Sequence, residues 1–196
     1  MRTMHVLETE RLMIRPIELG DLEAAHGIMD RCFGDGSHAN DPVAIEARRP
    51  WVQWMALNHV QLAQLFQPPY GDRAVVLRSS GRMIGMAGLV PCLAPYGIVP
   101  ELRLGMSPVS KSQPEVGLFW AINADHQRNG FATEAGRALM DFALDEHGLG
   151  LHRIIATTDY DNLASQAVMR ALGMTLARNP QSTPAWLQVV GIMKAG

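Results

Sequence analysis

A short polar stretch, Gln127-Arg-Asn-Gly-Phe-Ala132, lies between an apolar run typical of a strand and a segment with helical periodicity. The first amides of a helix lack intrahelical partners, and the helix dipole adds partial positive charge there. Gly130 lets the backbone approach an anion closely, and Arg128 can supply a full positive charge. The stretch therefore suits a phosphate or pyrophosphate group, although an ordinary strand-to-helix turn is the competing interpretation.

Two further polar residues, Asn162 and Ser165, lie on the first turn of the next predicted helix, one strand further along the chain. In a parallel crossover the loops after both strands emerge at the same edge of the sheet, so both segments are expected to line one cleft. Asn162 taken alone is also a normal helix cap. No Gly-Lys-Ser/Thr follows Gly130 and no Gly-x-Gly-x-x-Gly occurs there, which argues against a Walker loop or a dinucleotide fingerprint.

The elements that must position these residues follow from periodicity and turn residues. Strands are predicted over 11–16, 74–77, 83–89, 115–122, 153–158, 174–178 and 187–193. Helices are predicted after Asp21, between Pro50 and Pro68, after Gly130 up to Gly148 and Gly150, and from Asp161 or Asn162 to Gly173. Residues 91–114 are expected to form a long connection. Antiparallel hairpins followed by one parallel β-α-β crossover predict an α/β domain with a mixed sheet.

Composition narrows the class of protein. The chain has 196 residues, a net charge of -2, 47% hydrophobic and 18% charged residues, which predicts a single folded domain over 1–196 and no disorder. This charge gives no case for a direct nucleic-acid partner. Residues 83–100 are uncharged, but three prolines argue against a membrane helix. Two cysteines, the lack of a secretory signal and histidines without metal-ligand spacing predict a cytoplasmic protein with no metal site.

Three motifs in order resemble the GNAT superfamily of acyl-CoA N-acyltransferases. Residues 127–135 (QRNGFATEA) are similar to the family's pyrophosphate loop, and 162–174 are similar to its following helix, with Asn162, Ser165 and Gly173 in place. Residues 7–16 (LETERLMIRP) resemble the start of the branch that includes ribosomal-protein alanine N-acetyltransferases.

The resemblance implies that acetyl-CoA binds between splayed parallel strands as co-substrate. Its pantetheine arm would pair with the backbone near Trp120, Ala121 and Ile122. Its diphosphate would bind the loop, and the resemblance assigns cofactor contacts there to Gln127, Arg128, Asn129, Gly130, Phe131, Ala132 and Thr133, with Asn162 and Ser165 from the next helix.

Two positions depart from the family pattern. Ala132 replaces the second glycine of the loop, which leaves room for the phosphate. Met169 stands where many members carry a tyrosine that protonates the leaving thiolate, and methionine has no proton to donate. Ser165, or a water held by Asn162 and Ser165, becomes the candidate for that catalytic role.

The attacking amine must also lose a proton, directly or through water. Glu115 at the start of a strand and Glu101 in the long connection are the candidate bases, and a solvated surface position is favoured for Glu101. For Glu134, within the loop motif, a structural hydrogen bond is favoured over catalysis. His126 is interpreted as a surface residue.

The leading hypothesis is an acetyl-CoA-dependent N-acetyltransferase that transfers acetyl to a primary amine by direct attack. The acceptor, a peptide N-terminus or a small-molecule amine, stays open, as does edge-strand pairing into a homodimer. A catalytically silent acyl-CoA-binding sensor or scaffold is the alternative, and a nucleotide-binding enzyme is the third hypothesis.

Overall fold

One mixed sheet runs through the molecule. The computed structural model describes residues 4–105, 110–181 and 183–196. Within them, eight strands follow the order β1-β2-β3-β4-β5-β6-β8-β7. The strands are β1 (Leu7–Glu8), β2 (Leu12–Pro16), β3 (Gly71–Leu77), β4 (Met83–Ala94), β5 (Gln113–Ile122), β6 (Arg153–Thr158), β7 (Thr175–Arg178) and β8 (Val189–Lys194). Neighbours are antiparallel except β5 and β6, which are parallel, so the predicted mixed α/β sheet is confirmed.

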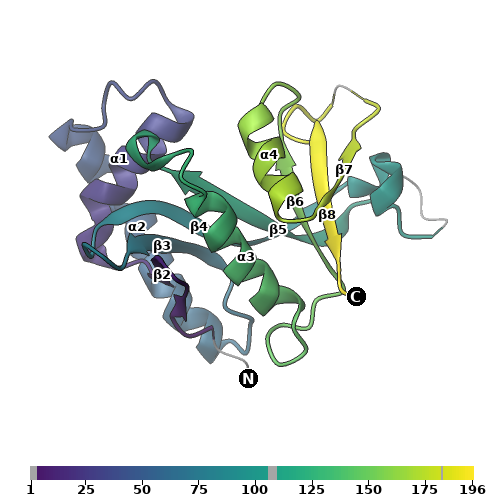
Figure 1. Ribbon diagram of the computed structural model, residues 1–196, viewed down its shortest axis with the longest axis horizontal. Coiled ribbons are helices and arrows are strands. Elements are labelled where there is room, and N and C mark those ends of the chain that lie inside the picture. Colours follow the sequence, from purple (N-terminus) through teal and green to yellow (C-terminus); the bar gives the residue numbers. More distant parts are fainter. Residues whose placement is uncertain (1–3, 106–109, 182) are drawn as a thin grey trace.

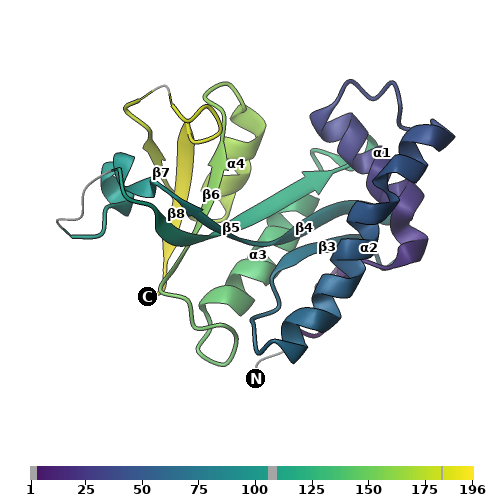
Figure 2. The same cartoon turned by 180° about the vertical axis from the view of Figure 1, so that it is seen from behind.

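Helices cover both faces of the sheet. α1 (Leu22–Phe33) and α2 (Pro42–Gln64) lie on one face, and α3 (Phe131–Leu144) and α4 (Leu163–Ala171) lie on the other, as Figures 1 and 2 show from opposite sides. The central strand β4 is buried along its apolar run from Met83 to Leu89, because helices cover both of its faces. In α3, Ala135, Leu139 and Ala143 recur every fourth residue and are fully buried.

Three of the predicted elements differ most from the structure. Helix α2 begins at Pro42 rather than after Pro50, because Asp41 accepts a hydrogen bond from the Val43 amide as an N-cap and Pro50 is accommodated inside the helix. Helix α3 ends at Leu144, before the predicted glycine stop, because Asp145 adopts an extended backbone.

The third difference lies in the predicted connection over 91–114. β4 continues to Ala94 and β5 starts at Gln113, so the two strands form a longer hairpin. Two short 3-10 helices, η2 (Tyr96–Ile98) and η3 (Pro100–Leu102), follow β4. Val99 and Leu102 are fully buried against β6 and β8. The η2–η3 segment therefore packs into a small hydrophobic core of its own and is not an exposed loop.

Asp21 precedes α1, but its carboxylate does not cap the helix. It accepts two hydrogen bonds of 2.7 Å from the Arg15 guanidinium and one from the Glu18 amide. No helix in the described ranges combines the length and hydropathy that crossing a bilayer requires.

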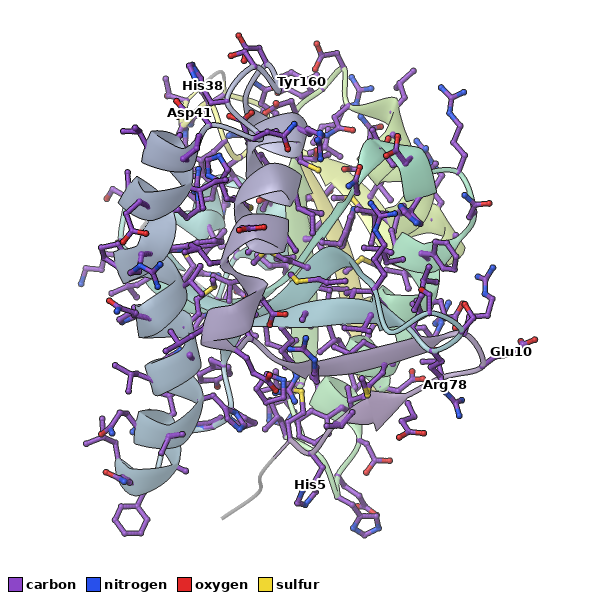
Figure 3. All side chains as sticks on the ribbon, turned by 90° about the vertical axis from the view of Figure 1, so that its left-hand side faces the viewer. His5, Glu10, His38, Asp41, Arg78 and Tyr160 are labelled. Carbon is purple, nitrogen blue, oxygen red and sulfur yellow. The ribbon has the colours of Figure 1, made fainter. Side chains whose placement is uncertain are left out.

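The loops after β5 and β6 lie at one end of the molecule (Figure 1). Figure 3 places His38 and Asp41, from the α1–α2 connection, and Tyr160, from the β6–α4 connection, at that end, whereas His5 lies at the opposite end. The segments predicted to form one cleft therefore share an end of the fold.

Candidate active site

The parallel strands β5 and β6 separate soon after they meet. Gly117 pairs with Ile155, and no other register pair joins these strands within the described residues. Beyond it, β5 continues to Ile122 along β4, whereas β6 continues to Thr158 along β8. Figure 1 shows β5 turning toward α1 and β6 toward α4. The edge of β5 after Gly117 therefore offers backbone hydrogen-bonding groups to an extended ligand.

The end of β5 is tied to the loop that follows it. Trp120 is half-buried, and Ala121 and Ile122 are buried. The Ile122 carbonyl accepts hydrogen bonds from the Gln127 side-chain Nε2 at 2.9 Å and from the Cys32 thiol at 3.4 Å. The Gln127 side chain thus holds the start of the predicted phosphate loop against the strand end.

The loop itself has an unusual backbone. Arg128 and Gly130 both have positive φ angles, of 60° and 80°. A left-handed arginine costs on the order of 1–3 kcal/mol, and such strain concentrates at ligand sites. Between them, the Asn129 side chain donates hydrogen bonds to the Gln127 and His126 carbonyls, at 2.9 and 3.2 Å. The polar side chain of Asn129 therefore stabilises the loop from within.

The N-terminus of α3 is open. No side chain caps it within the described residues, so the amides of Phe131, Ala132 and Thr133 remain available to an anion. The Arg128 side chain is exposed and forms no ion pair with any described residue. Open amides and an uncommitted guanidinium at one helix end suit a doubly charged phosphate group.

A contact that the sequence did not predict holds this helix end in place. Arg11 donates from Nε to Glu134 at 2.7 Å and from Nη1 to the Asn129 carbonyl at 3.0 Å, and its guanidinium lies 4.5 Å from the centre of the Phe131 ring. The Thr9 hydroxyl and the Arg11 amide also donate to Glu134, at 2.5 and 2.9 Å. In the sequence, the only sign of this contact is that Arg11 and Glu134 carry opposite charges and lie in two of the segments that resemble family motifs.

Glu134 is therefore a structural residue, as predicted. Burial by itself would raise its pKa, but the hydrogen bonds from Thr9 and Arg11 outweigh burial and hold the pKa below its ordinary value. A carboxylate that stays ionised can keep both N-terminal residues bound to α3.

The start of α4 brings Asn162 and Ser165 together. The Asn162 Oδ1 accepts a hydrogen bond from the Ser165 amide at 3.0 Å, which is a helix cap. The Ser165 hydroxyl is half-buried and has no hydrogen-bond partner among the described residues. Its oxygen is free for a ligand, whereas Asn162 already uses one acceptor.

The comparison with protein families agrees with this geometry. The Acetyltransferase (GNAT) domain family matches residues 11–175, which include Arg11, the separated strands, the loop and α4. The chain belongs to the GNAT acetyltransferase family.

One relative and two solved structures are similar to this chain over nearly its whole length. YjdG of Bacillus subtilis, an uncharacterised N-acetyltransferase, is 24% identical over 186 residues, which is 95% of this chain and 99% of YjdG. An acetyltransferase structure from Agrobacterium tumefaciens has a TM-score of 0.66 and 24% identity, covering 97% of this chain and 95% of that one. The ribosomal L7/L12 α-N-protein acetyltransferase RimL, solved with coenzyme A, has a TM-score of 0.58 and 16% identity over 95% of each chain.

Met169, which stands where the sequence resemblance expects a tyrosine, is buried. This side chain has no exposed surface, and a Cβ on Gly191 of β8 would meet its Cγ and Sδ at 3.0 Å. Position 169 is therefore filled by a residue that packs in the core and offers no hydroxyl.

Glu115 is not placed as a catalytic base should be. Its carboxylate side chain is 3% exposed and forms an ion pair with Arg153, and it accepts a further hydrogen bond from Gln113 at 2.9 Å. A base must be within reach of the amine or of a water, and this carboxylate is almost fully buried with both oxygens bonded to neighbouring side chains. These surroundings do not favour Glu115 as the predicted base.

The other candidates lie outside this arrangement. Glu101 is exposed, as expected for a solvated carboxylate. His126 is half-buried, and its buried Nδ1 has no hydrogen-bond partner in the part of the chain that the structure describes, so the surface interpretation is incomplete. No group of three or more metal-ligating side chains occurs among residues 4–105, 110–181 and 183–196.

Proposed function

We propose that this GNAT acetyltransferase transfers acetyl from acetyl-CoA to a primary amine by direct attack. The observation that carries the proposal is the parallel pair β5–β6, which separates after a single register pair, with the open N-terminus of α3 at the separated end. This arrangement offers an extended strand edge and an anion site to one ligand, as the two parts of coenzyme A require.

Each end of the cofactor has an assigned partner in this proposal. The diphosphate would bind the amides from Arg128 to Thr133, and the pantetheine arm would follow β5 toward Trp120. Because Gln127 already uses the Ile122 carbonyl, pantetheine pairing is proposed for the strand before Ile122.

The thiolate end belongs to α4 in this proposal. When the tetrahedral intermediate collapses, the C–S bond breaks and the sulfur takes up a proton or a hydrogen bond. The free Ser165 hydroxyl at the positive end of α4 can donate that hydrogen bond, with Asn162 fixing the first turn.

The acceptor is proposed as a peptide N-terminus or a small-molecule amine. The test is a panel of both amine classes with acetyl-CoA, with thiol release and acetylated product measured together. Thiol release that requires an amine and yields the matching N-acetyl product supports the proposal. Coenzyme A binding without amine-dependent release would overturn it in favour of a silent cofactor-binding module.

A further inference from the structure

We infer that the Glu115–Arg153 ion pair is a positioning pair that sets how far β5 and β6 separate. The inference rests on the proposed function, since the separated strands are the proposed acetyl-CoA site. Neither residue is proposed to touch the reacting atoms.

The place of the pair in the sheet carries the argument. Glu115 stands two residues before Gly117 on β5, and Arg153 stands two residues before Ile155 on β6. Among the described residues, Gly117 and Ile155 form the one register pair between these parallel strands. Because side chains two residues apart share a sheet face, Glu115 and Arg153 lie on the same face as Gly117 and Ile155, one pleat before that register pair.

Glu115 and Arg153 form a two-pronged, largely buried ion pair between the strands, the β5–β6 clamp. Arg153 donates from Nε to one Glu115 oxygen at 2.8 Å and from Nη2 to the other. The Glu115 side chain is 3% exposed and that of Arg153 is 19% exposed, so water competes little. A two-pronged guanidinium–carboxylate pair fixes direction as well as distance. Removing one partner would leave a buried charge without compensation.

The clamp also holds a third segment. The Leu102 carbonyl, at the end of η3, accepts hydrogen bonds from Gln113 at 2.8 Å and from Arg153 at 3.2 Å. Leu102 is fully buried in the core that covers β6 and β8. One polar network therefore joins both strands of the proposed cofactor site to the η2–η3 segment.

This arrangement gives the pair a functional consequence. Within the described residues one backbone register pair joins β5 to β6, and the Glu115–Arg153 ion pair adds a cross-strand contact next to it, so we expect loss of this ion pair to change the angle between the strands. Binding groups must hold their geometry within roughly 0.5 Å to be effective. Breaking the Glu115–Arg153 ion pair should therefore lower the affinity for coenzyme A, although neither residue is proposed to contact coenzyme A.

The test measures coenzyme A affinity by calorimetry in Glu115→Gln, in Arg153→Gln and in the exchanged double variant Glu115→Arg with Arg153→Glu. Each single variant should bind coenzyme A about tenfold more weakly or worse, and the exchange should recover most of that loss. The acetyl-CoA KM should rise with the dissociation constant.

Arg15–Asp21 is the matched control pair. It has two contacts of 2.7 Å and side chains 19% and 10% exposed, and it joins β2 to the turn before α1. Asp21→Asn should lower the melting temperature and leave coenzyme A affinity within about twofold. A structural role alone would make both pairs behave alike.

The inference is overturned if Glu115→Gln and Arg153→Gln fold and bind coenzyme A as tightly as the wild type. It is also overturned if the exchanged double variant recovers stability but not coenzyme A affinity. If single variants fail to fold, the exchange and the milder Gln113→Ala decide. If the wild-type chain binds no coenzyme A, the proposed function fails. Amide exchange then tests the clamp alone, and Gly117 and Ile155 should exchange faster in Glu115→Gln than in Asp21→Asn.

Discussion

Gly130 and Gly81 share a left-handed backbone, with φ angles of 80° and 68°, but only Gly130 opens a helix in the proposed site. A Cβ at Gly130 would meet Arg11 at 3.5 Å, an ordinary contact, and one at Gly81 would meet nothing within 4 Å. Gly130→Val should weaken coenzyme A binding at least tenfold, about 1.4 kcal/mol, because it alters the anion-binding backbone. Gly81→Val carries the same backbone strain, and its coenzyme A affinity, measured by calorimetry, should match the wild type. Equal affinities in both folded variants would remove the loop from the proposed site.

The second prediction at the residue scale concerns the exposed guanidinium of Arg128. Arg128→Ala should lower coenzyme A affinity more at low salt than at high salt, because ions screen an exposed charge pair. Lys111→Ala, in the connection after η3, should change neither value. Dissociation constants at two salt concentrations check this, and a salt-independent loss would contradict a direct ionic contact.

The third prediction at the residue scale concerns Ser165. Its hydroxyl has no partner among the described residues, so Ser165→Ala should lower turnover by roughly ten- to a thousandfold, about 1.4–4 kcal/mol, through lost transition-state stabilisation. The acetyl-CoA KM should change less. If Ser165 only shapes the first turn of α4, the variant will melt slightly earlier and turn over normally. Turnover and melting temperature on the same preparation separate the two results.

Elements far apart in the sequence meet at Glu134, which joins the segment before β2 to the first turn of α3. Glu134→Gln should lower the melting temperature at neutral pH by about 2–5 °C, because it weakens contacts from Thr9 and Arg11. The folded pKa of Glu134 lies below its unfolded value, so this stabilisation is full above the unfolded pKa and is lost as pH falls through the folded pKa.

The difference between wild type and Glu134→Gln should therefore shrink toward acid pH. The control is Glu46→Gln in the exposed Glu46–Arg49 pair of α2, which should leave the melting temperature nearly unchanged. Thermal melts over a pH series measure both variants, and a constant difference across that series would contradict the assignment.

Local patterns predicted the elements near the site well. β6 has the bounds predicted for 153–158, and Asn162 and Gly173 bound α4 as expected, because these signals act within a few residues. The start of α2 was not predicted, since proline is normally a boundary and Pro50 lies inside the helix.

Contacts between segments escaped prediction for a different reason. The Arg11–Glu134 and Glu115–Arg153 pairs join residues 123 and 38 positions apart, and no short window holds both partners. Glu115 in isolation resembled a free carboxylate. Only the register of β5 against β6 shows that a guanidinium faces it.

At the scale of the whole molecule, one more titratable group, Asp72, makes the stability of the fold depend on pH. Asp72 on β3 has no ion-pair partner among the described residues, and burial raises its pKa to about 6. An acid whose folded pKa exceeds its unfolded value destabilises the fold as pH rises from about 4 through 6, and that cost persists at neutral pH. Asp72→Asn should stabilise the protein at neutral pH by roughly 1–3 kcal/mol. Denaturant melts at pH values on either side of this range check it, and equal gains at both would contradict the raised pKa.

The Arg11–Glu134 contact also bears on how the molecule reaches its native state. Thr9 and Glu134 are 125 residues apart, so the loop between them must close before the helix end is held. Closing a long loop costs entropy that only the completed contacts return, and non-local pairing of this kind is slow. We therefore expect the proposed anion site to be among the later parts of the fold to assemble. A ligand that binds this site selects chains whose distant segments have already met, and it draws the folding equilibrium toward them by mass action.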